Sequence, residues 1–183
     1  MHENDDAGQP APRRKPRVQI RGLVVGFMIG AFVALVGAVM LIALLRRPAP
    51  TITADDVVDA MERWDENGPA SYQMTIRVGG NRPGTIQMIV SDGEAISMTR
   101  DGHTPQQERT WAYWTVPGQF EMILRDFDSA EDPAEGFGAP AGSTTVFRGR
   151  FHPELGYPEF YERIVLGQQL DVRWEVTEFQ PRP

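Results

Sequence analysis

The sequence contains no cysteine among its 183 residues. Disulfide bonds, thiolate metal ligands, cysteine nucleophiles and lipid attachment to a cysteine are therefore all excluded. The absence does not by itself identify the compartment in which the protein works. Any attachment to a membrane must come from the polypeptide itself.

Motifs that would fix a reaction are also missing. The histidines His2, His103 and His152 lack the i, i+4 spacing of a helical zinc pair. No serine lies in a Gly-x-Ser-x-Gly elbow, and neither a glycine-rich phosphate loop nor an EF-hand calcium loop occurs. We therefore expect no catalytic, cofactor-binding or metal-binding residues.

Positive charge is scarce in the second part of the chain. Residues 51–183 contain 11 arginines, no lysine and 22 acidic residues, which gives a formal charge of −11. Nucleic acid and anionic lipid both attract basic surfaces. Neither is an expected partner of these residues.

One long apolar run precedes this acidic part. Residues 22–45 carry no charged side chain and exceed the ~18 apolar residues that indicate a membrane span. A cleaved signal peptide is the alternative, and the following segment PAPTITA could serve as its cleavage region. The run is longer than a signal-peptide core of about 7–15 residues and ends in Arg46-Arg47, so we predict a single transmembrane helix over 22–45.

The flanking charges predict the orientation of this helix. Two arginines, Arg46 and Arg47, follow the helix, whereas the residues before it include Arg13, Arg14, Lys15, Arg17 and Arg21. Loops rich in Lys and Arg stay cytoplasmic. We expect a disordered cytoplasmic tail at 1–21, a linker at 46–53, and a domain at 54–180 outside the inner cell membrane.

Small residues recur every fourth position in the apolar run, at Gly22, Gly26, Gly30, Ala34 and Ala38. Such a stripe lets a second helix approach closely, as in Gly-x-x-x-Gly dimers. The sequence therefore predicts, besides contact with the lipid bilayer, a homodimer or a complex with another membrane protein.

The first part of the domain shows a helix followed by alternating strands. Thr53 and Asp56 have capping-box spacing, and Asn67-Gly68-Pro69 supplies a C-cap glycine and a terminating proline, which predicts a helix over 54–67. Apolar residues then alternate with polar ones in two runs, 72–78 and 86–90. Asp92-Gly93 favours a hairpin turn before a third strand at 95–100.

The remaining residues predict one more helix and further strands. Trp111 to Val116 is interpreted as a short strand, Phe120 to Phe127 as a helix, and the acidic segment 131–143 as an exposed loop. Three closing strands are expected at 144–151, 160–166 and 172–179. Hairpins with two helices predict an α+β fold, with an antiparallel sheet of about six strands covered on one face.

Two further clusters have a functional and a plain interpretation. Aromatic side chains could form a platform for sugars, and carboxylates could hold calcium, but we favour core packing for the former and a solvated loop for the latter. The aromatic cluster is Trp111, Tyr113 and Trp114, and the acidic cluster is Asp126, Asp128, Glu131, Asp132 and Glu135.

The segment HPELGYPEFYERI, His152 to Ile164, is predicted to be a tight loop that leads into a strand. Pro153 and Pro158 restrict the backbone, Gly156 permits positive φ, and His152 and Tyr157 flank the turn and pack. We interpret the loop as a signature of the fold.

This loop carries a resemblance to a known family. Together with Trp64, the pair Ser71-Tyr72, the Asp92-Gly93 hairpin and the terminal strand Val176 to Phe179, it resembles the bacterial domain of unknown function 6174 family. That family commonly has Tyr-Asp-Pro where His152-Pro153 stands here, and many members carry cysteines in the first hairpin. The resemblance implies an exported, membrane- or lipid-anchored domain and no established activity.

These observations favour a non-catalytic extracytoplasmic module, anchored by one helix, that binds a protein or an envelope component. A membrane-tethered hydrolase and a small-ligand carrier that uses the concave face of the sheet are the alternatives. An enzyme needs convergent polar groups with perturbed pKa in a pocket, and a carrier needs an apolar cavity of about 300 Å³ or more.

Overall fold

The computed structural model describes residues 49–183. The predicted tail, the predicted membrane helix with its stripe from Gly22 to Ala38, and the start of the predicted linker lie outside these residues. Within residues 49–183, no helix combines the length and the apolar character that crossing a bilayer requires.

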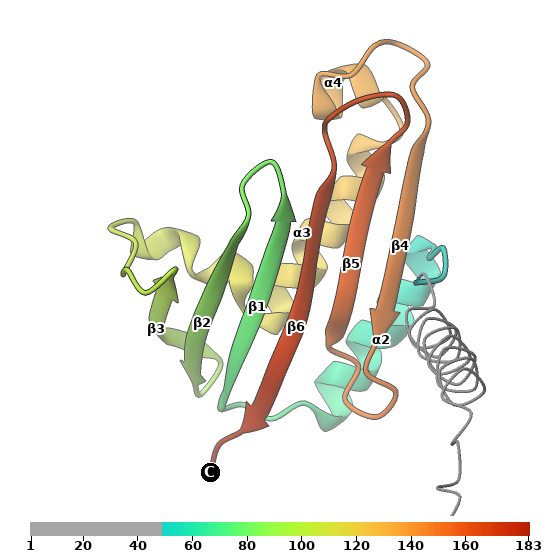
Figure 1. Ribbon diagram of the computed structural model, residues 1–183. Helices are drawn as coiled ribbons and strands as arrows, with labels where there is room; N and C mark the ends of the chain where they lie inside the picture. The colour runs from blue at the N-terminus through green and yellow to red at the C-terminus, as the bar shows by residue number, and fades with distance from the viewer. Residues whose placement is uncertain (1–48) are drawn as a thin grey trace, which may run out of the picture. The chain divides into compact units, whose positions relative to one another are not determined.

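Six strands form a single sheet in the order β3-β2-β1-β6-β5-β4 (Figure 1). Every neighbouring pair is antiparallel. The strands are β1 (Tyr72–Gly80), β2 (Gly84–Ser91), β3 (Glu94–Arg100), β4 (Thr145–Phe151), β5 (Pro158–Val165) and β6 (Val172–Pro181). The predicted α+β class with a six-stranded antiparallel sheet is confirmed.

Two long helices, α2 (Ala54–Asn67) and α3 (Val116–Ser129), cross the same face of the sheet (Figure 1). The core lies between them and the strands, because alternate strand side chains point to this face. Its largest fully buried side chains include Trp174, Tyr72, Tyr161, Phe120, Ile76, Ile86 and Ile123. No helix of the described residues lies over the opposite face, which we call the open face (Figure 1).

Helix α2 begins and ends as the sequence predicts, although its last cap works differently. Thr53 Oγ1 accepts a hydrogen bond from the Asp56 amide at 3.3 Å, and the Asp56 carboxylate accepts one from the Thr53 amide at 2.8 Å. Gly68 is extended, with φ −69°, so it does not supply a left-handed cap. Glycine is needed there because a Cβ would lie 2.5 Å from the Trp64 carbonyl oxygen.

The β2–β3 hairpin has the predicted turn. Asp92 and Gly93 both have positive φ, 52° and 83°, which suits a two-residue turn. A register shift then separates the pairs Ile89↔Ser97 and Val90↔Ala95. The extra residue is Ile96, whose side chain is 59% exposed.

The predicted strand at Trp111 to Val116 is wrong. The chain forms two short 3-10 turns instead, Glu108–Thr110 and Ala112–Trp114. Thr115 then caps α3, and its side chain accepts a hydrogen bond from the Gly118 amide. A run this short and aromatic fits a strand by composition, but packing against the core holds it as turns: Trp111 is buried, whereas Tyr113 is exposed.

We expected segment 131–143 to be an exposed loop, and this is only partly right. It contains a short helix, α4 (Pro133–Phe137), whose first turn is capped by the Asp132 carboxylate. Pro133 and Ala139 are buried. Asp132 as the cap and Pro133 at the first helical position are a combination typical of a helix start.

The described end of the linker adds to the sheet. The Ile52 amide donates to the Phe147 carbonyl at 3.1 Å, and the Gly149 amide donates to the Pro50 carbonyl at 3.0 Å. Thr51 forms an isolated antiparallel bridge with Arg148. Residues 50–52, in the described part of the predicted linker, therefore lie along the outer edge of β4.

Candidate functional site

The loop from His152 to Pro158 contacts α2 and the end of the sheet. Gly156 has φ 82°, and a Cβ on it would lie 2.2 Å from the Ala60 carbonyl oxygen. His152 Nδ1 accepts hydrogen bonds from the amides of Glu154 and Leu155, at 3.3 and 3.1 Å. Its ring stacks on Tyr157 at 4.9 Å between centroids. These contacts occupy His152 in holding the turn.

Tyr157 continues this stack into the core. Its ring lies 4.3 Å from that of Phe179, which in turn stacks on Tyr72 at 5.2 Å. Trp64 of α2 meets Tyr72 edge to face at 5.5 Å. The aromatic rings thus join the loop, the helix and two central strands, a geometry that serves packing.

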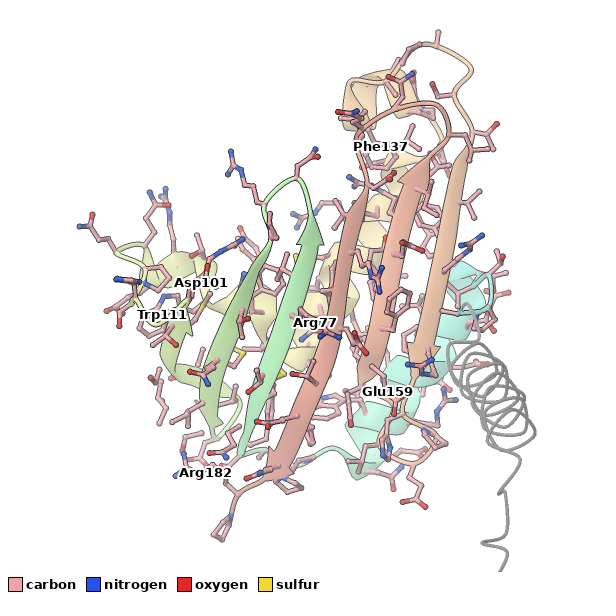
Figure 2. The ribbon with its side chains drawn as sticks, viewed as in Figure 1. Arg77, Asp101, Trp111, Phe137, Glu159 and Arg182 are labelled. Atoms are coloured by element: carbon pink, nitrogen blue, oxygen red, sulfur yellow. The ribbon has the colours of Figure 1, made fainter. Side chains whose placement is uncertain are left out.

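The open face carries a ladder of polar contacts across its centre, where β1 pairs with β6. Gln73 donates to Gln180 at 2.7 Å, and Thr75 donates to Glu178 at 3.3 Å. The ladder ends in an ion pair of 2.6 Å between Arg77 and Glu175, and Figure 2 labels Arg77 on this face. The side chains are exposed, so the contacts fix their positions more than they stabilise the fold.

A groove of about 290 Å³ lies beside this ladder, over β6, β1, β2 and β3. Its lining is rich in amides and hydroxyls, with one carboxylate, one isoleucine and two methionines that are 2% exposed. The lining residues are Gln73, Met74, Thr75, Gln87, Met88, Ile89, Ser97, Thr99, Glu178 and Gln180. Neutral donors and acceptors at this density can hydrogen-bond a neutral polar chain such as a peptide backbone or a glycan.

The β4–β5 part of the sheet is charged instead. Arg148 lies 3.8 Å from Glu162, and Arg150 lies 2.9 Å from Glu159. Arg173 of β6 stacks over the Phe160 ring at 5.1 Å. Acid and base are paired here, so this part of the sheet presents no strong field of one sign.

A second polar cluster lies inside the molecule, where α3 faces β5. Asp126 accepts hydrogen bonds from Tyr161 at 2.8 Å and from Arg163 at 2.6 Å. Arg163 also donates to the Leu170 carbonyl and lies over the Phe137 ring at 4.2 Å. Arg163 therefore links α3, α4, β5 and the turn after β5.

Burial decides the protonation behaviour of this cluster. It raises the pKa of the Asp126 carboxyl above its usual value, and the Arg163 charge opposes that shift. Burial and the Asp126 charge also raise the pKa of Tyr161, so its hydroxyl stays protonated and donates to Asp126. The cluster holds two helices on the sheet.

The expectation of a solvated acidic loop is wrong for Asp126, whose carboxylate is 18% exposed in its pair with Arg163. Sequence reasoning missed this role because it grouped Asp126 with its neighbours along the chain. A usable signal was the spacing of Tyr161 and Arg163. They lie two residues apart on one strand and therefore share a face of the sheet. An arginine on the same face as a core tyrosine is buried and needs a partner of opposite charge.

A third polar group is fully buried. Gln119 has no exposed surface. It accepts from the Trp174 indole at 3.1 Å and donates to the Trp114 carbonyl at 2.9 Å. These bonds satisfy the amide and fix the turn that precedes α3.

Within residues 49–183, no three His, Cys, Asp or Glu side chains are placed to hold one metal ion. His103 bonds to the Asp101 carbonyl at 3.0 Å, and His152 holds its own turn. Neither histidine belongs to a group of three or more such side chains within residues 49–183.

No protein-family model, curated protein or solved structure matches the chain. The resemblance to the domain of unknown function 6174 family therefore stays a prediction.

Proposed function

We propose that the protein is a single-pass membrane protein whose C-terminal domain lies outside the cytoplasm and binds a protein or an envelope polymer through its open face. The observation that carries this proposal is the groove of about 290 Å³ on a sheet face that no described helix covers. An antiparallel sheet often leaves one face in water, so an uncovered face alone does not indicate binding. Here hydrogen bonds between side chains also hold the groove wall in place, as a binding surface requires.

The length of the predicted linker limits how far from the bilayer the domain can begin. Thr51, which is paired with β4, lies six positions after Leu45, the end of the predicted span. At roughly 3.5 Å per extended residue, the domain begins within about 20 Å of the hydrocarbon core. The partner must therefore lie near the membrane surface.

The small-residue stripe gives the anchor its own role in this proposal. Gly22, Gly26, Gly30, Ala34 and Ala38 pack against a second helix, from another copy or from a different membrane protein. Such an assembly would place two or more open faces on one membrane patch. Binding to a repetitive envelope polymer would then gain from multivalency.

The small-ligand carrier is a second candidate, favoured by the groove's size. Its volume lies near the lower limit of small-molecule pockets, roughly 300–1,000 Å³. The mixed lining suits a polar ligand better than a lipid. Native mass spectrometry of the purified chain distinguishes the two, because a carrier retains a small bound molecule that a Gln87→Trp variant loses.

Photo-crosslinking in intact cells tests the binding proposal. A benzoylphenylalanine at Gln87, inside the groove, should capture one discrete partner, whereas the same residue at Glu66, on the exposed surface of α2, should not. Both positions are exposed, so their chemical reactivity is matched. Equal labelling at both positions, or no adduct at Gln87, would contradict binding at the open face.

A further inference from the structure

The two edges of the sheet differ in how they are covered. The outer edge of β4 pairs with the linker through Pro50, Thr51 and Ile52. The outer edge of β3 carries a bridge between Arg100 and His103 at its last residue, and the described chain offers no strand beside the rest of it. An unpaired edge presents amides and carbonyls that can accept another strand.

A hollow of about 470 Å³ lies beside this edge, between the start of β3 and the 3-10 turns. Ile96 lines it and is 59% exposed, whereas Trp111 lines it and is 9% exposed. The Trp111 Nε1 atom has no hydrogen-bond partner within the described residues. Trp111, labelled in Figure 2, and Ile96 thus flank a space that an apolar side chain of a partner could fill.

The bulge at Ile96 works against pairing between copies. Bulges twist an edge strand and discourage extended sheet growth. It also turns Ile96 outward beside the hollow, where an incoming strand would cover it. The edge therefore favours a short segment over a long one.

Charge identifies the kind of segment. The residues that line the hollow include two acidic ones, Glu94 and Glu108, and no basic one. Residues 51–183 carry a formal charge of −11, so a second copy would bring acid against acid. A basic strand would meet complementary charge at the rim.

We propose that the β3 edge docks a short, extended, basic segment of a partner protein. The segment adds a strand beside β3, places an apolar side chain against Ile96 and Trp111, and directs Lys or Arg toward Glu94 and Glu108. The hollow beside this edge shares no lining residue with the groove of the open face, so the proposal extends the proposed function without depending on it.

The test uses the full chain in nanodiscs of zwitterionic lipid, with empty nanodiscs as the blank. The probe is a fluorescent peptide of about ten residues that alternates valine with arginine, and its matched control has glutamate in place of arginine. Fluorescence anisotropy should show binding of the arginine peptide and none of the glutamate peptide. Hydrogen exchange should slow in β3 and remain unchanged in β4.

Three variants locate the contact. Glu94→Lys together with Glu108→Lys should weaken binding of the arginine peptide about tenfold, because two attractive rim charges become repulsive. Ile96→Lys should weaken it similarly, whereas Val58→Lys, at an exposed apolar residue of α2, should not. Gln87→Arg in the groove should leave binding unchanged, which separates this surface from the open face.

Several results would overturn the proposal. These are absence of arginine-peptide binding, equal binding of the glutamate peptide, and protection that falls on strands other than β3. Self-association of the chain with β3 protected in the absence of peptide would show that a second copy is the occupant.

Discussion

Arg163 and Asp126 form an ion pair of 2.6 Å between β5 and α3, with side chains 12% and 18% exposed. The pair joins residues that lie 37 positions apart in the chain. The pair holds α3 on the sheet, and the opposite face of that sheet is the proposed binding face.

Removing one partner of this pair should cost more stability than removing an exposed one. Asp126→Ala leaves the Arg163 guanidinium and the Tyr161 hydroxyl without their acceptor in a mostly buried place, and we expect a loss of about 3 kcal/mol in the free energy of unfolding. Glu175→Ala, at the more exposed pair with Arg77, should cost less than about 1 kcal/mol. Urea unfolding of both variants checks this, and equal losses would refute the assignment.

The same carboxyl should leave a signature in the pH dependence of stability. Because burial raises the pKa of Asp126 above 3.8, the folded chain holds this proton more tightly than the unfolded chain does. Its contribution is complete below pH 3.8 and is lost as pH rises through the raised pKa. The groups that face it are Tyr161, Arg163 and Arg125.

The measurement is the urea midpoint as a function of pH for the wild-type chain and for Asp126→Asn. The difference between the two isolates this group from the other carboxyls. Wild-type stability relative to the variant should decline as pH rises from about 4. A relative gain over that range would mean that the Arg163 charge outweighs burial.

Gly156 and Gly138 offer a matched pair for the loop that carries the sequence signature. Both have positive φ, 82° and 67°, but a Cβ on Gly156 would meet the Ala60 carbonyl at 2.2 Å, whereas one on Gly138 would meet open space. Gly138→Ala should cost about 1 kcal/mol from backbone strain alone. Gly156→Ala should cost at least about 2 kcal/mol more, because α2 must move. Similar thermal midpoints for the two variants would contradict this role of the loop.

Local features of the sequence predicted much of the fold. Thr53 with Asp56 marked the start of α2, and Asp92-Gly93 marked the first hairpin, because each acts through neighbouring backbone atoms. The placement of β6 beside β1 could not be predicted in this way, since it depends on contacts between distant segments. The groove on the open face depends on the same placement, because Gln180 and Glu178 come from β6.

Two predictions were wrong because the residues concerned are compatible with either of two local environments. Trp111 and Trp114 fit a strand by propensity, but their packing against the core and the cap at Thr115 favour turns. Asp126 fits a solvated acidic stretch by composition, yet the sheet places Tyr161 and Arg163 opposite it.

We expect the predicted membrane helix to associate through its small residues. Replacing Gly26 and Gly30 together with leucine fills the stripe and leaves insertion intact, because leucine favours the bilayer core. We expect the signal in a membrane-helix association assay to fall sharply. A control with Val24→Leu and Phe27→Leu, off the stripe, should keep the signal, and loss in both would point to a general effect of leucine.

The most direct test of the central claim, a membrane-anchored domain outside the cytoplasm, uses the absence of cysteine. Gln9→Cys in the tail and Asp65→Cys on the exposed surface of α2 each create a single thiol in the chain. A membrane-impermeant maleimide added to spheroplasts should label Asp65→Cys at once and Gln9→Cys after permeabilisation. Labelling of the tail in intact spheroplasts, with the domain protected, would contradict the account.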